Sequence, residues 1–166
     1  MDLLFRFAPL VDTEVRGELL DGWRQHLISA EPDIRQDFFK TTLLPYWKWC
    51  GRQQFFSNPS ANQERLAFWE LLPYSSSAFP EAVKIAINLA PAKIEHSRFV
   101  LEELYKAASK VDSEILVGFL IKMLEVDIHP QWRRDEWQAA WEAVKNHDSP
   151  KLAVFRDNLA KRGVGD

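Results

Sequence analysis

Apolar residues recur at intervals of three and four along almost the whole chain, which is the spacing of one face of an α-helix. No segment alternates between apolar and polar residues cleanly enough to predict a β-strand. Prolines separate the helical stretches, because proline fits the first turn of a helix but disrupts its interior. The pattern therefore predicts an all-α fold.

The C-terminal two-thirds of the chain has the more regular pattern. It predicts six helices, over residues 60–73, 78–90, 95–109, 113–126, 131–146 and 150–162. Consecutive helices pair into three hairpins. Asp112 or Ser113 is expected to cap the fourth of these helices, and Gly163 is expected to end the sixth in a left-handed conformation.

A shift of 36 residues places the apolar positions of one hairpin on those of the next. It pairs Leu101 with Trp137, Leu104 with Ala140, Tyr105 with Trp141, Ala108 with Val144, Leu116 with Leu152, Phe119 with Phe155 and Met123 with Leu159. Agreement in both helices indicates an internal repeat, whose hairpins bury their apolar faces by stacking. We therefore expect a HEAT-like α-solenoid; an irregular α-helical bundle is the alternative.

The N-terminal part of the chain is predicted to be helical but less regular. It contains a short helix over residues 2–8, a longer one over 12–28 and two further short helices, around Ile34 and around Leu44. Residues 51–59 form the longest predicted loop. The helix over 12–28 is expected to turn four apolar residues toward the core at intervals of four: Val15, Leu19, Trp23 and Leu27.

The composition suits one all-α domain over residues 1–166, with the less regular part over 1–58, the hairpins over 59–162 and a tail over 163–166. Apolar residues make up 46% of the chain, enough for a buried core. The net charge of -3 leaves no basic footprint for nucleic acid over the whole chain. Cys50 has no cysteine to pair with, and no apolar run approaches the ~18 residues that span a bilayer. We expect a cytoplasmic protein with no membrane partner.

Residues with catalytic or metal-binding chemistry do not gather into a known motif. The histidines lack the i, i+4 spacing of a helical metal site: His26, His96, His129 and His147. The six glycines form no phosphate-binding loop, and Cys50 lies among aromatic residues that favour a buried thiol. We predict no catalytic residue, no metal and no cofactor.

Two clusters of aromatic and basic residues are candidate interaction surfaces. The first contains Trp47, Trp49 and Arg52, and the second contains Trp132, Arg133 and Arg134. Tryptophan and arginine are enriched at the energetic centres of protein interfaces. The structural alternative is that the tryptophans fill the space between hairpins while the arginines remain solvated.

Residues 47–91 contain a distinctive order of tryptophan, arginine and Phe-Pro positions. In order, it reads Trp47, Gly51-Arg52, Glu64-Arg65-Leu66, Trp69, Leu72 and Phe79-Pro80-Glu81-Ala82-Val83. This stretch, residues 47–91, resembles the DUF4020-type C-terminal helical domains of unassigned function in large bacterial proteins. Those domains often follow SIR2-like or other NTP- or NAD-processing modules linked to phage defence. The resemblance implies a bacterial, defence-associated setting at the C-terminus of a larger protein and brings no catalytic residue.

These observations favour a non-catalytic helical interaction or scaffold module, whose partner is another protein or another domain of its parent protein. A nucleic-acid-associated helical domain is the alternative, and it would use Lys106, Lys110, Arg133 and Arg134. The net charge disfavours that alternative. An enzyme whose site a single sequence does not reveal is the third hypothesis.

Overall fold

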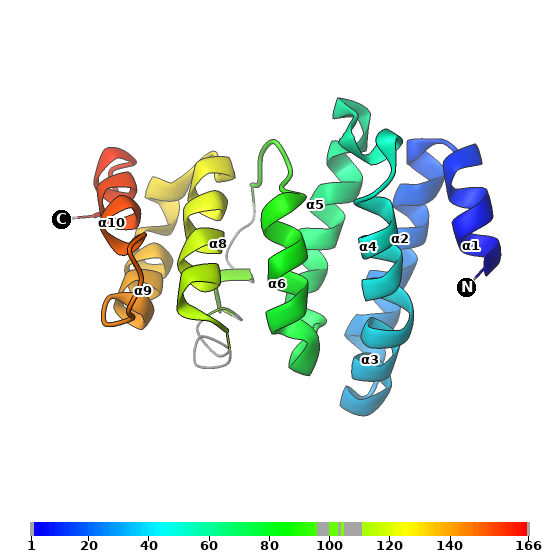
Figure 1. The fold of residues 1–166 in the computed structure, drawn as a ribbon, viewed down its shortest axis with the longest axis horizontal. Helices are drawn as coiled ribbons and strands as arrows, with labels where there is room; N and C mark the ends of the chain where they lie inside the picture. The colour runs from blue at the N-terminus through cyan, green and yellow to red at the C-terminus, as the bar shows by residue number, and fades with distance from the viewer. Residues whose placement is uncertain (1, 96–99, 103, 105–110, 166) are drawn as a thin grey trace.

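A computed structural model describes residues 2–95, 100–102, 104 and 111–165 of the chain, and this part is helical (Figure 1). The described residues form no β-strand. Ile94 and Asp127 make an isolated parallel β-bridge, which joins the connector after one helix to the connector after another. The all-α prediction is confirmed.

The elements follow the predicted order closely. The α-helices are α1 (Asp2–Phe7), α2 (Thr13–Ser29), α3 (Pro32–Phe38), α4 (Leu44–Cys50), α5 (Asn62–Leu71), α6 (Phe79–Asn88), α8 (Ser113–Val126), α9 (Arg134–Val144) and α10 (Leu152–Lys161). The predicted helix over 95–109 lies largely outside the described residues, although Leu101 and Leu104 within it are buried. The predicted caps also form: the Asp112 carboxylate accepts hydrogen bonds from the first turn of α8, and Gly163 has a φ of 70°.

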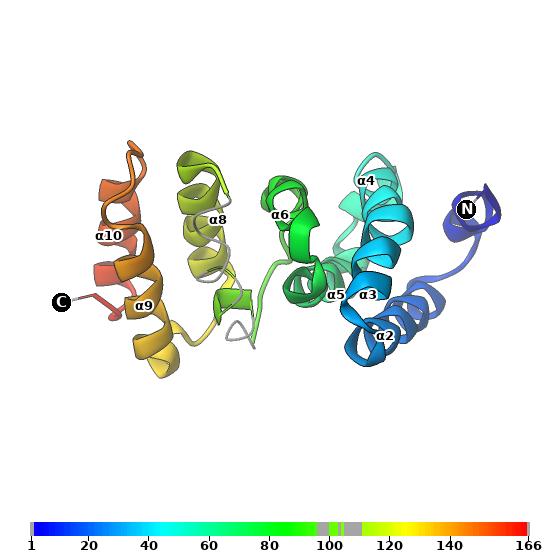
Figure 2. The ribbon, with the colours of Figure 1, turned by 90° about the horizontal axis from the view of Figure 1, so that it is seen from below.

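The helices lie side by side in two rows that run from the N-terminal to the C-terminal end (Figures 1 and 2). One row contains α2, α5 and α9, and the other contains α4, α6, α8 and α10 (Figure 2). Within the rows α2 packs against α5, and α8 packs between α6 and α10. The two termini therefore lie at opposite ends of an elongated molecule.

Helices α3 and α4 form one continuous helical stretch, where the sequence predicts two short helices. A π-helical segment, Phe39–Leu43, joins them, and the Leu44 N–H donates to the Phe39 carbonyl. Pro45 has no N–H and would clash with the preceding turn of a regular α-helix. The wider π turn just before Pro45 accommodates the proline without ending the helix.

The predicted core face of α2 is partly wrong. Val15 is 48% exposed, while Leu19 and Trp23 are half-buried. The residues that α2 buries are Arg16, Leu20 and Leu27. The face is rotated by about one residue, about 100° on a helix, because Arg16 turns inward to an ion partner on α5.

Large aromatic side chains fill the space between the helices. Trp47, Trp69 and Trp137 are each 0% exposed. Trp47 stacks on Phe68 with ring centroids 4.9 Å apart, and the Trp69 indole N–H donates to the Ala86 carbonyl at 3.2 Å. Each ring buries a large apolar area, so these tryptophans tie neighbouring helices together.

The predicted loop over 51–59 is instead a compact turn with two short 3-10 segments, Gln54–Ser57 and Pro59–Ala61. Phe56 is 1% exposed and packs edge-on against Phe68. The buried ring holds this segment against the core, which the turn-rich sequence does not reveal.

Candidate functional site

The first predicted cluster does not form a surface. Trp47 is fully buried, and Trp49 is half-buried beneath Phe5, whose ring centroid lies 5.4 Å away. Arg52 is exposed at the turn after α4. The prediction of Trp47 as an interaction residue is therefore wrong, and the Trp49 ring packs mainly against α1. Residues two apart on a helix point in different directions, which explains the separation.

The second predicted cluster divides in the same way. Trp132 is 73% exposed and stacks on the His129 ring, with centroids 3.8 Å apart. The Arg133 side chain is 13% exposed and forms an ion pair with the buried Asp127 at 2.8 Å. Arg134 begins α9 and is exposed. Arg133 is therefore a structural residue, and the sequence alone does not reveal its partner, the buried Asp127 carboxylate.

The two clusters lie on different parts of the molecule, on α4 and at the α8–α9 connector (Figure 1). They do not form one shared surface. The nucleic-acid alternative is weakened as well, because Asp127 neutralises Arg133. Lys106 and Lys110, which that alternative also needs, lie outside the described residues.

Asp127 organises the α8–α9 connector. Its carboxylate is fully buried and accepts hydrogen bonds from the Trp137 indole N–H at 3.1 Å and from the His129 backbone N–H at 3.0 Å. The Arg162 guanidinium donates to the Asp127 backbone carbonyl. One residue therefore links α8, α9 and the end of α10.

Arg16 and Glu64 form a buried ion pair that joins α2 to α5. The Arg16 Nε atom lies 3.0 and 2.9 Å from the two Glu64 carboxylate oxygens. The guanidinium also lies over the Phe55 ring, 4.4 Å from its centroid. Burial by itself would lower the pKa of Arg16, but the hydrogen bond and the attraction to Glu64 outweigh burial and raise that pKa.

Tyr46 and Cys50 lie close enough to interact with this ion pair, and both are 0% exposed. Burial raises the pKa of the Cys50 thiol to about 12 and also raises the pKa of the Tyr46 hydroxyl. Both groups are therefore neutral at physiological pH. A neutral, inaccessible thiol is a poor nucleophile, so the cluster serves as polar core.

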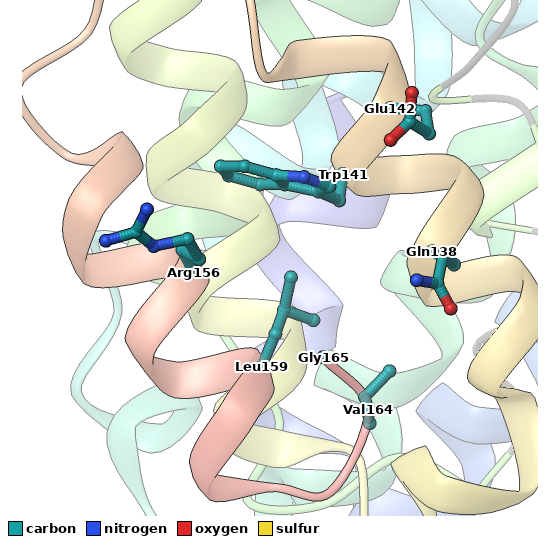
Figure 3. Close-up of a pocket in the computed structure, with 7 residues that line it drawn as sticks. All are labelled: Gln138, Trp141, Glu142, Arg156, Leu159, Val164 and Gly165. Atoms are coloured by element: carbon teal, nitrogen blue, oxygen red, sulfur yellow. The ribbon is translucent and has the colours of Figure 1, made fainter.

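A pocket of about 250 Å³ opens at the C-terminal end of the rows, between α9, α10 and the tail (Figure 3). Trp141 and Leu159 form an apolar shelf, with Arg156 toward one side and Glu142 toward the other (Figure 3). The volume falls below the roughly 300–1,000 Å³ of typical small-molecule sites. The pocket suits a single side chain better than a cofactor.

Exposed large apolar side chains are most frequent in the N-terminal part of the chain. Among the described residues, five of the eight large apolar side chains that are exposed lie between residues 7 and 34: Phe7, Leu10, Val15, Ile28 and Ile34. We call the first three, Phe7, Leu10 and Val15, the N-terminal apolar patch. They are 56%, 77% and 48% exposed. Ile28 lies near the other end of α2, about 20 Å along the helix from Val15.

The backbone beneath this patch is held by the buried ion pair. The Arg16 Nη1 atom donates to the carbonyl of Ala8 at 3.0 Å and also to the carbonyl of Val11. The Asp12 side chain caps α2 by accepting from the Val15 N–H at 3.0 Å. Residues 8–15 therefore form one fastened turn, and the patch is a preformed surface.

Comparison of the chain with protein-family models, with curated proteins and with solved structures found no match. The candidate site therefore depends on this chain's own geometry. In the part of the chain that the structure describes, no group of three or more His, Cys, Asp or Glu side chains is placed to hold a metal ion. None of the described helices combines the length and the apolar character needed to cross a membrane.

The sequence pattern does not reveal the N-terminal apolar patch. Val15 fits an apolar stripe at intervals of four, so the pattern assigned it to the core. Phe7 and Leu10 flank Pro9 in a short segment without a clear period. One available signal was Arg16, since a cation beside an apolar stripe can mark the true buried face when a carboxylate reaches it.

Proposed function

We propose that the chain is a non-catalytic helical interaction or scaffold module, built as a short HEAT-like array, and that its N-terminal end is the docking surface. The observation that carries this proposal is the N-terminal apolar patch of Phe7, Leu10 and Val15. Several large apolar side chains exposed within nine residues, beside a backbone that is held in place, are a candidate interaction site.

A comparison of α8 with α10 indicates that the C-terminal end is not a similar docking surface. Helix α8 is buried on both sides, and Val117, Leu120 and Leu124 are at most 1% exposed. The shift of 36 residues brings these positions to Ala153, Arg156 and Ala160 of α10, all of which are exposed. The inward positions Phe119 and Met123 become Phe155 and Leu159, which stay buried.

The outer face of α10 has therefore lost the large apolar residues that a further hairpin would need. A polar outer face on a terminal repeat is the usual way to end a stacked array in water. The tail residue Val164 is buried, and its N–H donates to the Leu159 carbonyl of α10 at 3.0 Å. The outer face of α10 is thus polar apart from its pocket side, whereas the N-terminal end leaves large apolar side chains exposed.

The resemblance of residues 47–91 to bacterial defence-associated domains remains part of this proposal. In that setting the partner at the N-terminal end is another domain of a parent protein, and in a free chain it is a separate protein. A cytoplasmic location is proposed with it, because the lone Cys50 is kept as a buried thiol.

Site-specific photo-crosslinking tests the proposal. A photoreactive residue at Leu10 is expected to give a discrete adduct in cells that make the protein. The same residue at Val154, which is 51% exposed on α10, is the matched control and is expected to give none. Once the partner has been purified, Leu10→Gln is expected to weaken its binding about tenfold or more, as for an interface anchor, while Val154→Gln leaves the affinity unchanged.

Equal crosslinking at the two ends would contradict the proposal. An unchanged affinity for the Leu10→Gln variant would contradict it as well. Circular dichroism of each variant shows whether the fold is kept, and both substitutions lie at exposed positions where stability changes are small, about 0.5 kcal/mol or less.

A further inference from the structure

We infer that the N-terminal apolar patch binds a basic amphipathic segment of a protein, in which lysine or arginine flanks two or three apolar residues. This inference rests on the proposed function and adds the chemistry of the partner. It follows from the charges around the patch, from its rigid backbone and from the occupants that those charges disfavour.

The border of the patch is acidic. Four carboxylates on or next to the first half of α2 are exposed: Asp12, Glu14, Glu18 and Asp21. Arg16 is the one cation between residues 12 and 21, and it is buried with Glu64. Arg6 on α1 is the nearest exposed cation in the chain on the N-terminal side. The solvent-facing charge along residues 12–21 is therefore negative.

Two of these carboxylates are available to a ligand. Among the described residues no cation lies within ion-pair distance of Glu14 or Glu18, whereas Asp21 is paired with Arg24 at 2.6 Å. Glu14 and Glu18 are one helical turn apart and lie on the same side of α2. Glu14 is one residue before Val15 and Glu18 is three residues after it. When an apolar side chain of the ligand packs on Val15, the lysines or arginines next to it in the ligand can therefore reach these carboxylates.

The patch is also rigid before a partner arrives. Its backbone is tied through the Arg16 hydrogen bonds to the Ala8 and Val11 carbonyls and through the Asp12 cap. A preformed surface loses little conformational entropy on binding, so even three apolar anchors can contribute net affinity. Complementary charges then speed association and select among partners.

The same charges disfavour the other occupants. Nucleic acid and anionic membranes would bring phosphates against Glu14 and Glu18, which repels them at low salt. A symmetric dimer through this patch would place the same carboxylates of two copies side by side, because a two-fold interface pairs a surface with itself. A basic amphipathic segment meets both the apolar centre and the acidic border.

Two synthetic peptides test the inference on the full chain. One is an amphipathic helix of about 18 residues, or about five turns, with a leucine face and a lysine face. The other carries glutamate in place of every lysine. Fluorescence anisotropy is expected to show the lysine peptide binding about tenfold or more tightly at low salt, with the difference shrinking at physiological salt.

Charge reversal and anchor removal identify the surface. The double variant Glu14→Lys, Glu18→Lys is expected to weaken the lysine peptide about tenfold and to strengthen the glutamate peptide. Glu14→Gln with Glu18→Gln removes the charge with less effect on the helix and is expected to reduce the preference between the peptides. Leu10→Gln should weaken the lysine peptide, while Val154→Gln should not.

Equal affinity for the two peptides, or a preference that survives charge reversal, would overturn the inference. A dimer in light scattering that Leu10→Gln dissociates would also overturn it, because the occupant would then be a second copy. If the Leu10 crosslink forms but neither peptide binds, the inference fails while the proposed function stands. If the crosslink also fails, the proposed function fails with it.

Discussion

The Arg16 guanidinium lies against the Glu64 carboxylate with Nε–O distances of 3.0 and 2.9 Å, and the two side chains are 7% and 1% exposed. This contact crosses 48 residues of sequence and joins α2 to α5. Because Arg16 also binds the Ala8 and Val11 carbonyls, the ion pair fixes the turn that presents the N-terminal apolar patch. The stability of the core and the shape of the proposed docking surface thus depend on the same two residues.

Glu64→Gln is expected to destabilise the protein by about 3–5 kcal/mol, because it leaves the buried Arg16 charge without its counter-ion. Urea denaturation measures the loss. The exposed pair Asp21–Arg24 provides the control, and Asp21→Asn should cost less than about 1 kcal/mol. Similar losses of stability for the two variants would contradict the prediction that the buried Arg16–Glu64 pair matters more for stability than the exposed Asp21–Arg24 pair.

Removal of the Asp127 carboxylate is expected to loosen the α8–α9 connector. Asp127→Ala leaves the Trp137 indole N–H and the Arg133 charge without their shared acceptor, so we expect a loss of about 3–5 kcal/mol. Urea denaturation measures the loss, with Glu125→Gln as the control, since Glu125 forms an exposed pair with Lys122. A loss no larger than that of Glu125→Gln would contradict the role given to Asp127.

Much of the fold follows from local patterns in the sequence. The described helices after residue 60, the Asp112 cap and the left-handed Gly163 are predictable because each depends on residues within a few positions of one another. The face that α2 buries is not predictable in the same way. It depends on Glu64, which lies 48 residues away, and the buried pair overrides the apolar stripe that contains Val15.

The candidate site was less predictable than the fold for the same reason. Aromatic and basic residues suggest an interface by type, but their exposure depends on distant partners. Phe68 stacks on Trp47, Phe5 covers Trp49, and Asp127 pairs with Arg133. Trp132, by contrast, stacks only on the nearby His129 ring among the described contacts, and it is exposed as predicted for a surface residue.

Alkaline pH is expected to destabilise the protein through Cys50. Burial raises the pKa of this thiol from 9.0 to about 12, so above pH 9 the unfolded chain loses a proton that the folded chain keeps. That difference favours unfolding between pH 9 and pH 12, and Tyr46 acts in the same direction. Between pH 8 and pH 10 the Cys50 contribution is on the order of 1 kcal/mol.

Cys50→Ala isolates this contribution. Between pH 8 and pH 10 the variant is expected to lose less stability than the parent chain, by on the order of 1 kcal/mol, whatever its own baseline stability. Guanidinium denaturation at the two pH values measures the difference. Identical pH dependence in the two proteins would show that Cys50 is accessible or already ionised in the fold.

The proposed closure of the C-terminal end makes a prediction about association. Arg156→Leu with Ala160→Leu gives the outer face of α10 the large apolar residues that α8 carries at Leu120 and Leu124. Both positions are exposed, so the fold should persist, with a stability change of about 1 kcal/mol or less. Because the new apolar face is uncovered, light scattering should show more self-association than in the parent chain at the same concentration. The reverse exchange, Leu120→Arg, buries an unpaired charge between α6 and α10 and should cost more than about 3 kcal/mol. If the double leucine variant associates no more than the parent chain, the polar face of α10 does not terminate the array. The contrast between the two ends would then no longer support the N-terminal end as the docking surface.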